Sequence, residues 1–451
     1  MARVRVGQGS RRNCLRAPAH RGWSVTWLAP TSGPVDATIS IPGSKSLTNR
    51  YLVLAALGGS RVRIHNPLIA RDTELMAQAL RTLGASVTRD AASWIVEPGP
   101  IRGGRVECGL AGTVMRFIPP IAALASEPVV LDGDPAARLR PMNAIVEGLR
   151  GLGVRVEAAD RDGSPVLPVT INGQGLLAGG RLDIDASASS QFVSALLLAG
   201  PLMTAGLDLR HVGDRLPSQP HIDMTIDVLR TAGIDVEQVA GQHRWLVRPG
   251  VPQLPELTVE PDLSNAGAFL AAAMVTGGTV RIPGWPQRTT QPGDSYRHIF
   301  VAMGGRAWLE GDTLHLHGPQ AILPYDADMC DVGELVPTVA AVAAFAEGTS
   351  RLRNIGQLRG HETDRLSAIV NELAKVGISA RVEGDDLVVD GARPCAGATI
   401  DSYDDHRMAT FGAILGLRLP GTHVINIETT AKTLPEFVPL WTRAFSSEGH
   451  L

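Results

Sequence analysis

The chain has 451 residues, of which 44% are hydrophobic and 19% charged, and its formal net charge is −3. This composition is typical of a soluble globular protein of about two domains, and the near-neutral charge gives no reason to expect a nucleic-acid partner. Glycine and proline interrupt the longest apolar stretch, residues 192–207, which argues against a membrane-spanning helix. The four cysteines, Cys14, Cys108, Cys330 and Cys395, form no metal or disulfide spacing, which favours a cytoplasmic protein.

The first 22 residues differ from the rest of the chain. They contain six arginines and no acidic residue, and they lack apolar periodicity. We expect a short disordered basic tail at 1–22. A targeting segment or a misassigned start codon is the alternative, so these residues do not enter the fold argument.

From Gly43 onward one pattern recurs six times. A polar or glycine-rich loop leads into an alanine-rich apolar helix, and a turn of small residues then leads into a short strand rich in β-branched residues. The apolar helices are predicted to begin near Ser46, Thr113, Ser190, Ser264, Glu334 and His406. In five copies a second, amphipathic helix ends at a glycine and leads into two strands. These helices are predicted at 76–84, 145–153, 225–233, 299–304 and 369–377.

The sixth copy has its second helix, at 435–445, but no strands after it. Strands predicted at 25–28 and 37–41, near the other end of the chain, would complete it. Joining the termini in this way gives six equal units in two lobes of three. The first lobe is predicted at 23–42 and 262–451 and the second at 43–261, with crossings near Gly43 and Asp262.

Small residues dominate the six apolar helices, so these helices can pack closely on all sides and are predicted to be interior. Three parallel buried helices in each lobe would point three N-termini at one face. Because helix N-termini carry partial positive charge, two facing lobes would direct six such ends at a single cleft. That cleft would attract phosphates and carboxylates.

The loops before these helices carry unusual polar residues. In the first, Lys45 and Arg50 flank a helix start, although such a turn taken alone equally fits a capped helix with two solvated cations. In the second, Gly112 allows a ligand to approach backbone N–H groups. Arg116 lies within the helix, either as a ligand contact or as a structural ion-pair partner, and we favour the structural role.

The remaining loops add hydroxyls, an amide, cations and acids. The cations are Lys45, Arg50, Arg140, Arg365, Arg407 and Lys432, and among them lie Glu334, His361 and Glu362. This number of cations suits small substrates that carry several phosphates and carboxylates, and acids placed among them suit proton transfer. The sequence shows no metal-ligand spacing, so we expect neither a metal nor another cofactor.

Taken in order, these motifs resemble those of the 5-enolpyruvylshikimate-3-phosphate synthase family, from about Val35 to the C-terminus. The resemblance rests on Gly43-Ser44-Lys45-Ser46 with Asn49-Arg50, Ala111-Gly112-Thr113 with Met115-Arg116, Arg140-Pro141, Ser189-Ser190-Gln191, Pro261-Asp262, Arg351 to Ile355, Glu362 to Arg365, Asp405 to Ala409 and Ala431-Lys432-Thr433. It implies an α/β fold, a two-lobed inside-out α/β barrel of six βαβαββ repeats, three in each lobe.

The resemblance also implies an activity. The enolpyruvyl group of phosphoenolpyruvate would pass to the 5-hydroxyl of shikimate 3-phosphate, with release of phosphate, by addition and elimination through a tetrahedral intermediate. This step belongs to the shikimate pathway to chorismate and the aromatic amino acids. Glu362 would protonate the methylene, Glu334 would act as the base toward the hydroxyl, and Lys45 and His361 would complete the catalytic set.

Positions that match the family's motifs imply two sets of ligand contacts. Shikimate 3-phosphate would be bound by Lys45, Ser46, Arg50, Ser189, Ser190, Gln191, Ser218, Glu334, Gln357 and His361. Phosphoenolpyruvate would be bound by Lys45, Gly112, Arg140, Gln191, Arg365, Arg407 and Lys432. Lys45 and Gln191 appear in both sets, which implies that the two substrates lie side by side.

The chain departs from the commonest family pattern in places. Substituted positions are Leu110 for asparagine, Phe117 for proline, His221 for tyrosine, Glu334 for aspartate, Gln357 for asparagine and His361 for lysine. The charge of His361 is expected to depend on pH near neutrality. Asp331 is an alternative base one turn away, but the spacing to Gly348 favours Glu334.

Two other functions stay open. A UDP-N-acetylglucosamine enolpyruvyl transferase would share the fold and chemistry, but it usually carries a reactive cysteine in the loop that corresponds to 133–140, where this chain has none. A non-catalytic protein that binds shikimate 3-phosphate would also keep the anion site. We expect an enzyme that is monomeric and cytoplasmic, binds no membrane, and closes its cleft on anionic substrates.

Overall fold

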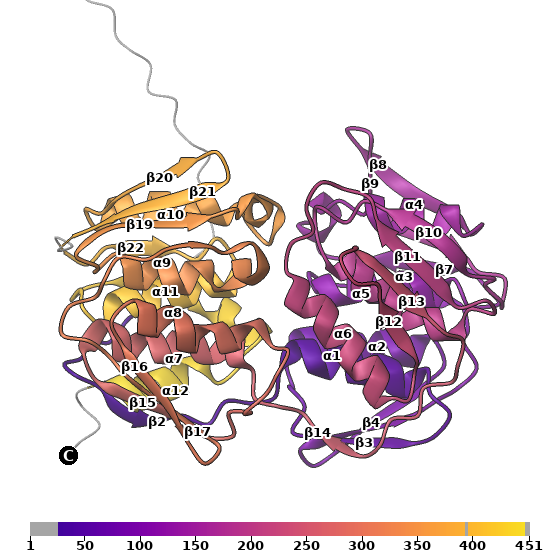
Figure 1. Ribbon diagram of the computed structural model, residues 1–451, viewed down its shortest axis with the longest axis horizontal. Helices are drawn as coiled ribbons and strands as arrows, with labels where there is room; N and C mark the ends of the chain where they lie inside the picture. Colours follow the sequence, from indigo (N-terminus) through magenta and orange to yellow (C-terminus); the bar gives the residue numbers. More distant parts are fainter. Residues whose placement is uncertain (1–25, 393–395, 447–451) are drawn as a thin grey trace, which may run out of the picture.

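The computed structural model describes residues 26–392 and 396–446, so the tail predicted at 1–22 lies outside the described residues. Figure 1 shows two lobes side by side, and their strands alternate with helices along the chain. The hydrophobic residues form two separate clusters. One draws on 47–259, and we call this part the second lobe. The other draws on 35–41 and 263–445, and we call it the first lobe.

The second lobe contains three four-stranded mixed sheets. In spatial order, these are β14 (Leu257–Thr258), β3 (Val62–His65), β5 (Ser93–Glu97) and β4 (Ser86–Asp90); β6 (Gly104–Glu107), β7 (Val129–Asp132), β9 (Ser164–Asn172) and β8 (Arg155–Arg161); and β10 (Gly180–Ile184), β11 (Leu207–His211), β13 (Arg244–Val247) and β12 (Val236–Gln238). In each sheet the first two strands are parallel and the other pairings are antiparallel.

The first lobe repeats this arrangement. Its sheets are β2 (Asp36–Thr38), β15 (Thr279–Ile282), β17 (Thr313–His317) and β16 (Arg306–Glu310); β18 (Asp326–Asp328), β19 (Gly348–Arg353), β21 (Asp386–Gly391) and β20 (Ser379–Glu383); and the three-stranded β22 (Thr399–Asp401), β23 (His423–Ile425) and β1 (Thr26–Leu28). The predicted α/β fold of repeated units around buried helices is confirmed.

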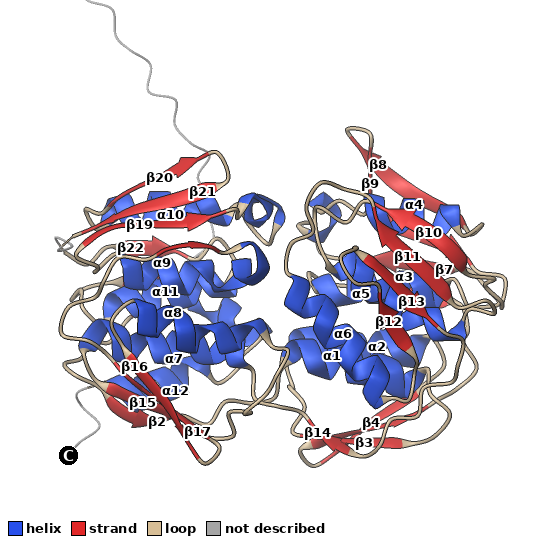
Figure 2. Ribbon diagram, in the orientation of Figure 1, coloured by secondary structure: helices blue, strands red, loops and turns tan. Residues whose placement is uncertain are grey.

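Helices fill the interior of each lobe, and strands lie outside them (Figure 2). The apolar helices are α1 (Lys45–Ala56), α3 (Gly112–Ala122), α5 (Gln191–Ala199), α7 (Leu263–Thr276), α9 (Val336–Ala343) and α11 (His406–Gly416). The amphipathic helices are α2 (Arg71–Thr82), α4 (Asn143–Gly151), α6 (Gln219–Thr231), α8 (Tyr296–Ala302), α10 (Arg365–Lys375) and α12 (Phe437–Phe445). The amphipathic helices start two to six residues away from the predicted starts, whereas five of the six apolar helices start within one residue of them. The exception is α9, because Glu334 lies in the preceding 3₁₀ turn η4 (Cys330–Leu335).

The sixth unit is completed only in part as predicted. Strand β1 pairs antiparallel with β23, so the N-terminal segment does join the last sheet. Strand β2, however, pairs in parallel with β15, with Asp36 opposite Thr279. The prediction that 37–41 also completes the sixth unit is therefore wrong. Strand β2 instead supplies the parallel edge strand of the first sheet of the first lobe, just before the chain crosses to the second lobe. Strand β14 plays the same part beside β3, just before the chain crosses back.

The two crossing segments are bonded to each other. Gly43 and Pro261 form an antiparallel bridge, and Asp262 N–H donates to Pro42 O at 2.8 Å. A Cβ at position 43 would lie 1.9 Å from Asn66 O, so only glycine fits. The Asp262 carboxylate accepts from Asn265 N and from Lys45 N, both at 2.9 Å, and thus caps α7 and α1 together. This pairing brings the N-termini of both helices to one point between the lobes.

Candidate active site

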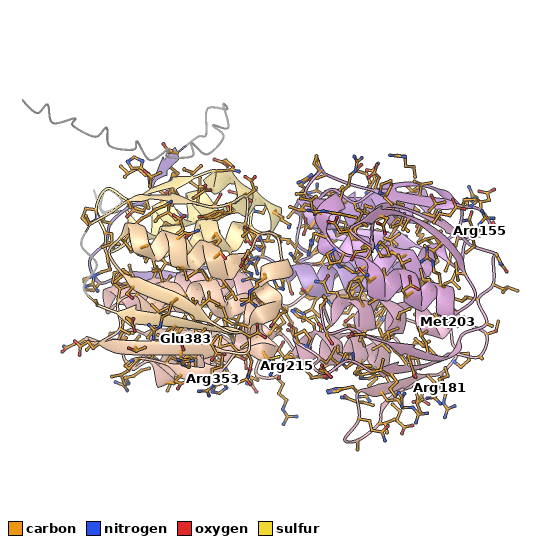
Figure 3. The ribbon with its side chains drawn as sticks, turned by 90° about the horizontal axis from the view of Figure 1, so that it is seen from above. Arg155, Arg181, Met203, Arg215, Arg353 and Glu383 are labelled. Atoms are coloured by element: carbon orange, nitrogen blue, oxygen red, sulfur yellow. The ribbon has the colours of Figure 1, made fainter. Side chains whose placement is uncertain are left out.

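A cavity of about 350 Å³ lies between the lobes, and both lobes line it. Seen from above, the lobes meet beside Arg215 (Figure 3). Of the residues predicted to bind ligands, the lining contains Lys45, Ser46, Gly112, Arg140, Ser189, Ser190, Gln191, Ser218, Glu334, Gln357, His361, Glu362, Arg365 and Arg407. Most lie at or near the start of a helix, where the partial positive charge of the helix end favours anions.

The first turn of α1 brings Lys45 and Ser46 to the cavity. Ser44 caps the helix, since its hydroxyl accepts from Leu47 N at 3.4 Å. Lys45 Nζ lies 3.4 Å from the buried Asp72 Oδ2, a long contact that leaves the ammonium group free to meet a ligand. The helix start therefore offers a cation, a hydroxyl and backbone N–H groups together.

Arg50 lies behind the cavity rather than in its lining. Its side chain is buried, and Nε donates to Thr225 Oγ1 at 2.8 Å while Nη2 donates to His221 O at 2.9 Å. Burial lowers the pKa of Arg50 to about 9. These bonds join α1 to α6, so the structure gives Arg50 neutral partners and a position one layer away from the predicted ligand.

Two arginines converge at the start of α3. A Cβ at Gly112 would lie 3.3 Å from Arg140 Nη1 and 3.4 Å from Arg116 Nη1. Both arginines line the cavity, and the buried Nε of each has no hydrogen-bond partner within the part of the chain that the structure describes. Burial, together with the charge of Arg140, lowers the pKa of Arg116 well below its usual value. The expectation that Arg116 is a structural ion-pair partner is wrong, because no described carboxylate pairs with it. Its guanidinium instead lies over the Phe192 ring, 5.6 Å from the ring centroid, and its Nη1 lies 3.5 Å from Gly112 O.

Hydroxyls and an amide line the next helix starts. Ser190 is buried at the start of α5, and Ser189 Oγ accepts from Gln191 N at 3.3 Å. Gln191 Oε1 is buried without a partner. Ser218 precedes α6 with φ of 58°, a conformation that costs energy for a non-glycine residue and is often found at functional sites.

Glu334 and Asp331 lie on the same 3₁₀ turn but in different surroundings. Glu334 lines the cavity, and its Oε1 lies 3.0 Å from His221 Nε2 of the opposite lobe. Burial raises the pKa of Glu334, but His221 and Arg407 outweigh burial and lower it to about 2. Asp331 is exposed and accepts from Gln219 N at 3.2 Å. Gln357 Nε2 donates to Cys330 O at 3.2 Å and completes this wall.

His361 and Arg365 form a bonded group with Asp405. Arg365 donates from Nε to Asp405 Oδ2 at 2.7 Å and from Nη2 to Oδ1 at 3.1 Å. Its Nη1 lies 3.0 Å from His361 Nδ1. Burial, Arg365 and Arg140 lower the pKa of His361 to about 3. The expectation that its charge changes near neutral pH is therefore wrong, because a buried imidazole beside two guanidinium groups stays neutral.

Glu362 is held by two partners in the first lobe. Its Oε1 lies 2.6 Å from Lys432 Nζ, and its Oε2 lies 3.1 Å from His406 Nδ1. Burial raises the pKa of Glu362, but the charge of Lys432 outweighs it and keeps the pKa well below the usual value. Lys432 is buried behind the lining, where it also reaches Leu110 O in the other lobe at 3.5 Å.

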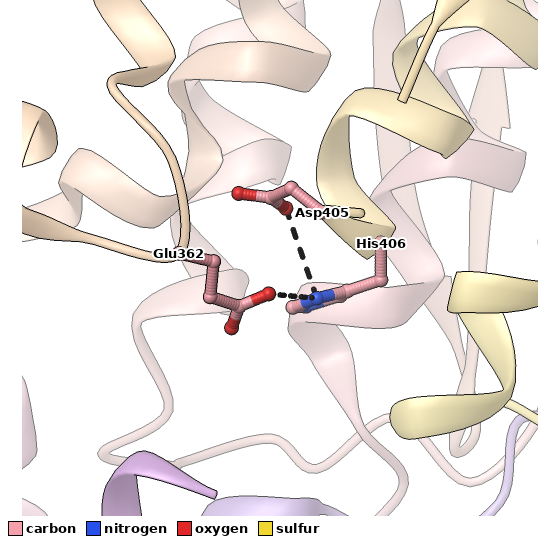
Figure 4. A group of neighbouring side chains, drawn as sticks. All are labelled: Glu362, Asp405 and His406. Carbon is pink, nitrogen blue, oxygen red and sulfur yellow. Dashed lines mark hydrogen bonds and ion pairs between the residues drawn. The ribbon is translucent and has the colours of Figure 1, made fainter. Parts of the chain in front are cut away.

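Glu362, Asp405 and His406 lie close enough to surround a metal ion (Figure 4). However, Lys432 already pairs with Glu362, and Arg365 binds both oxygens of Asp405. A divalent cation would have to displace these charges, which makes this group a poor metal site. Asp405 instead accepts from Arg407 N at 2.8 Å and fixes the start of α11, where Arg407 faces the cavity.

Sequence reasoning missed several residues of the site. The lining also contains Arg116, His221, His406, Asp72 and Asp262. Their place in the loops before helices was a usable signal for His406 and Asp262. Nothing in the sequence indicated that Asp72 would face Lys45 or that His221 would face Glu334, because both contacts depend on how separate units pack.

The fold and the cavity define a class of two-lobed protein that gathers two carboxylates among several cations between its lobes, an arrangement suited to small polyanionic molecules. The model of the EPSP synthase (3-phosphoshikimate 1-carboxyvinyltransferase) family matches residues 30–441. The chain therefore belongs to the EPSP synthase family.

Curated and solved proteins resemble the chain over nearly its whole length. A 3-phosphoshikimate 1-carboxyvinyltransferase of Kocuria rhizophila is 50% identical over 444 residues, which cover 94% of this chain and 97% of the relative. The structure of an EPSP synthase from Acinetobacter baumannii is similar with a TM-score of 0.76 at 24% identity, over 93% of this chain and 98% of the other. The enolpyruvyl transferase NikO from Streptomyces tendae has a TM-score of 0.69 at 20% identity, over 92% and 96%. At these identities, the similarity to the two solved structures supports the fold alone.

Proposed function

We propose that the chain catalyses the reaction for which its family is named. It transfers the enolpyruvyl group of phosphoenolpyruvate to the 5-hydroxyl of shikimate 3-phosphate and releases phosphate, a step in aromatic amino acid biosynthesis. One observation carries the proposal. Two carboxylates, Glu334 and Glu362, whose side chains are each 11% exposed, share a cavity with Arg116 and Arg140, which have no carboxylate partner among the described residues. Anion clamps beside acid and base groups suit a reaction that moves protons on a polyanionic substrate pair.

Shikimate 3-phosphate is assigned mainly to the second lobe. Its proposed contacts are Lys45, Ser46, Ser189, Ser190, Gln191 and Ser218, with Glu334, Gln357 and His361 from the first lobe. All of them line the cavity, which supports the assignment. Arg50 is proposed to act from outside the cavity lining, since its hydrogen bonds to Thr225 and His221 hold α1 against α6. His361, neutral at physiological pH, contributes a hydrogen bond rather than a charge.

Phosphoenolpyruvate is assigned to the positive part of the cavity. Its proposed contacts are Lys45, Gly112, Arg140, Gln191, Arg365 and Arg407. Lys432 acts on the same ligand through its neighbour Glu362. It would contact phosphoenolpyruvate directly once the negative charge of the ligand competes with Glu362 for the ammonium group. The absence of a side chain at Gly112 supports this assignment, because it leaves backbone N–H groups open beside Arg140.

Glu334 is proposed as the base, in preference to Asp331. It lies in the cavity wall and is ionised, whereas Asp331 is exposed and bonded to the start of α6. The hydroxyl proton passes to the Glu334 carboxylate while the hydroxyl oxygen attacks C2 of phosphoenolpyruvate. The methylene carbon gains a proton from Glu362 and becomes a methyl group. The tetrahedral intermediate then loses phosphate while the Glu362 carboxylate takes a proton back from that methyl group, which restores the double bond.

Glu362 needs a proton before it can donate one. Beside Lys432 it is ionised, since its pKa lies well below the usual value. The phosphate and carboxylate groups of the substrates bring negative charge close to Glu362 and compete for Lys432. Both effects raise the pKa of a carboxyl group. Substrate binding is therefore proposed to prepare the donor, with His406 on the other oxygen as the neighbouring proton carrier.

The test is phosphate release by the purified full-length protein, with each substrate added alone and then together. Release that requires both supports the proposal, and Glu334→Gln and Glu362→Gln should each lower kcat by about 10²–10⁴-fold. Binding of shikimate 3-phosphate without release would instead favour the non-catalytic binding protein. No binding would favour UDP-N-acetylglucosamine as the acceptor.

Oligomeric state and location are further parts of the proposal. We propose a monomer that works in the cytoplasm. Sedimentation at several protein concentrations would test the first point, and a concentration-dependent mass would contradict it. Among the described helices, none is long and apolar enough to cross a membrane.

A further inference from the structure

One ion pair crosses the cleft at the proposed base. His221 lies in the first turn of α6, in the second lobe, and Glu334 lies in η4 of the first lobe. His221 Nε2 and Glu334 Oε1 are 3.0 Å apart, and the side chains are 19% and 11% exposed. Both line the cavity, so the pair is shielded from bulk water on most sides while it faces the ligand space.

This pair is part of a short seam between the lobes. Two backbone groups at the start of α6 donate to the same turn, Ser218 N to Cys330 O and Gln219 N to Asp331 Oδ1, each at 3.2 Å. The seam therefore fixes where α6 lies against η4. The Glu334 carboxylate meets His221 through Oε1, and Glu334 lines the cavity in which the acceptor hydroxyl would lie.

The charge of Glu334 depends on this contact. Burial favours the neutral acid, yet His221, with help from Arg407, lowers the pKa of Glu334 to about 2. Without His221 the carboxyl group would lose its nearest hydrogen-bond donor and keep the cost of burial. The pKa of Glu334 would then rise, and its side chain could move to other hydrogen-bond partners. A protonated carboxyl group cannot accept the hydroxyl proton.

We propose that His221 is a positioning residue, which holds Glu334 toward the acceptor hydroxyl from the opposite lobe, so that the base is assembled only when the lobes are closed. The inference rests on the proposed function, because it assigns Glu334 the role of base. When Glu334 takes the hydroxyl proton, its charge disappears and its attraction to His221 weakens. Proton transfer and the strength of the seam are therefore linked.

The groups around the pair come from five helices. His221 O accepts from Arg50 on α1, and Gln219 on the same turn of α6 bonds both Asp331 and Asp223. The charges that face Glu334 in the first lobe belong to Arg407 on α11 and Arg365 on α10, and the neutral phenol of Tyr296 on α8 lies nearby. These cations also favour the ionised form of Glu334, so removal of His221 should weaken the base rather than abolish it.

The test compares His221→Gln, which keeps a hydrogen-bond donor, with His221→Phe, which keeps only size. We expect kcat to fall about 10-fold in the first variant and about 100-fold in the second, with little change in the KM for phosphoenolpyruvate. The pH profile of kcat should change in both, because the Glu334 carboxyl group loses a neighbour that lowers its pKa. Arg215→Gln is the matched control, since it removes an exposed charge near Cys330, on the turn that also carries Glu334, and Arg215 is not among the lining residues of the cavity.

A double-mutant cycle decides whether His221 acts through Glu334. In a Glu334→Gln background, His221→Phe should cost less than about 3-fold further, because the group that it positions is already lost. An equal cost in both backgrounds, an unchanged pH profile or an unchanged kcat would each overturn the inference. If His221→Phe does not fold, the same comparison is made with His221→Gln. A wild-type protein that releases no phosphate would contradict the proposed function itself and is checked first.

Discussion

The cations of the cavity differ in what neutralises them. Arg365 has Asp405 and Lys432 has Glu362, both as close salt bridges within the first lobe. Arg116 and Arg140 of the second lobe have no carboxylate partner among the described residues, and each has a buried nitrogen without a hydrogen bond. Burying unpaired charge costs free energy, and proteins retain it where a ligand supplies the missing partner. The second lobe therefore holds the anion site in a strained, high-energy form.

Replacing Arg116 by methionine should separate stability from binding. We expect Arg116→Met to raise the free energy of unfolding by about 1–3 kcal/mol, because an unpaired buried charge and its repulsion from Arg140 are removed. The affinity for phosphoenolpyruvate should fall by at least about 10-fold. Urea unfolding and calorimetry measure the two effects. The exposed Arg155→Met is the control and should change stability by less than about 0.5 kcal/mol. Lower stability with unchanged affinity would make Arg116 structural.

The free energy of unfolding at acidic pH should depend on the ionisation of Glu334. Its pKa in the folded protein, about 2, lies below the ordinary value of 4.5, so the folded state gains stability from this group above about pH 4.5. That contribution is lost as the pH falls from about 4.5 towards 2. Glu334→Gln should therefore be less stable than the wild type at neutral pH, and the difference should shrink across this range. Asp331→Asn, at an exposed position on the same turn, is the control. A difference that does not depend on pH would contradict the assignment.

At the scale of elements, the site is built from helix starts. Lys45, Gly112, Gln191 and Arg407 each stand in the first turn of a buried helix, and these helices are alanine-rich and apolar, so they pack without exposed faces. The strands lie outside and do not reach the cavity. Helix N-termini then supply the N–H groups for anions without any dedicated loop.

Asp262 caps two of these helices at once, and its removal should cost more than the loss of a single cap. We expect Asp262→Ala to lower the free energy of unfolding by roughly 2–4 kcal/mol, because Asn265 N and Lys45 N both lose their acceptor. Asp364→Ala removes one cap, at α10, and should cost about 1 kcal/mol. Thermal unfolding compares them. Equal losses would mean that Asp262 does not join the two helices energetically.

At the scale of the molecule, the lobes are joined by two crossing segments and by the seam at α6 and η4. Unpaired cations and helix N-termini from both lobes meet in the cavity, where they repel one another in the absence of anions. The seam and the Lys432 contact with Leu110 O oppose this repulsion. Closure is therefore a balance that anionic ligands shift toward the closed form.

Small-angle scattering should detect that shift. We expect the radius of gyration of the purified protein to fall when shikimate 3-phosphate and phosphoenolpyruvate are added, because the ligands neutralise the cations of both lobes. His221→Phe should show a smaller change at the same ligand concentrations, since the seam is weaker. An unchanged radius at saturating ligand would contradict this account of closure.

The repeat, the buried helices and the residues at their starts can be predicted from the sequence, because these depend on local periodicity and on residue types at helix ends. Fourteen of its sixteen predicted site residues lie in the cavity lining. The remaining features come from the packing of the units. Arg50 and Lys432 lie behind the lining, β2 pairs with β15, Arg116 has no counter-ion among the described residues, and His221 lies against Glu334. Each of these depends on which groups from distant units come together and how deeply they are buried, and no local pattern encodes that.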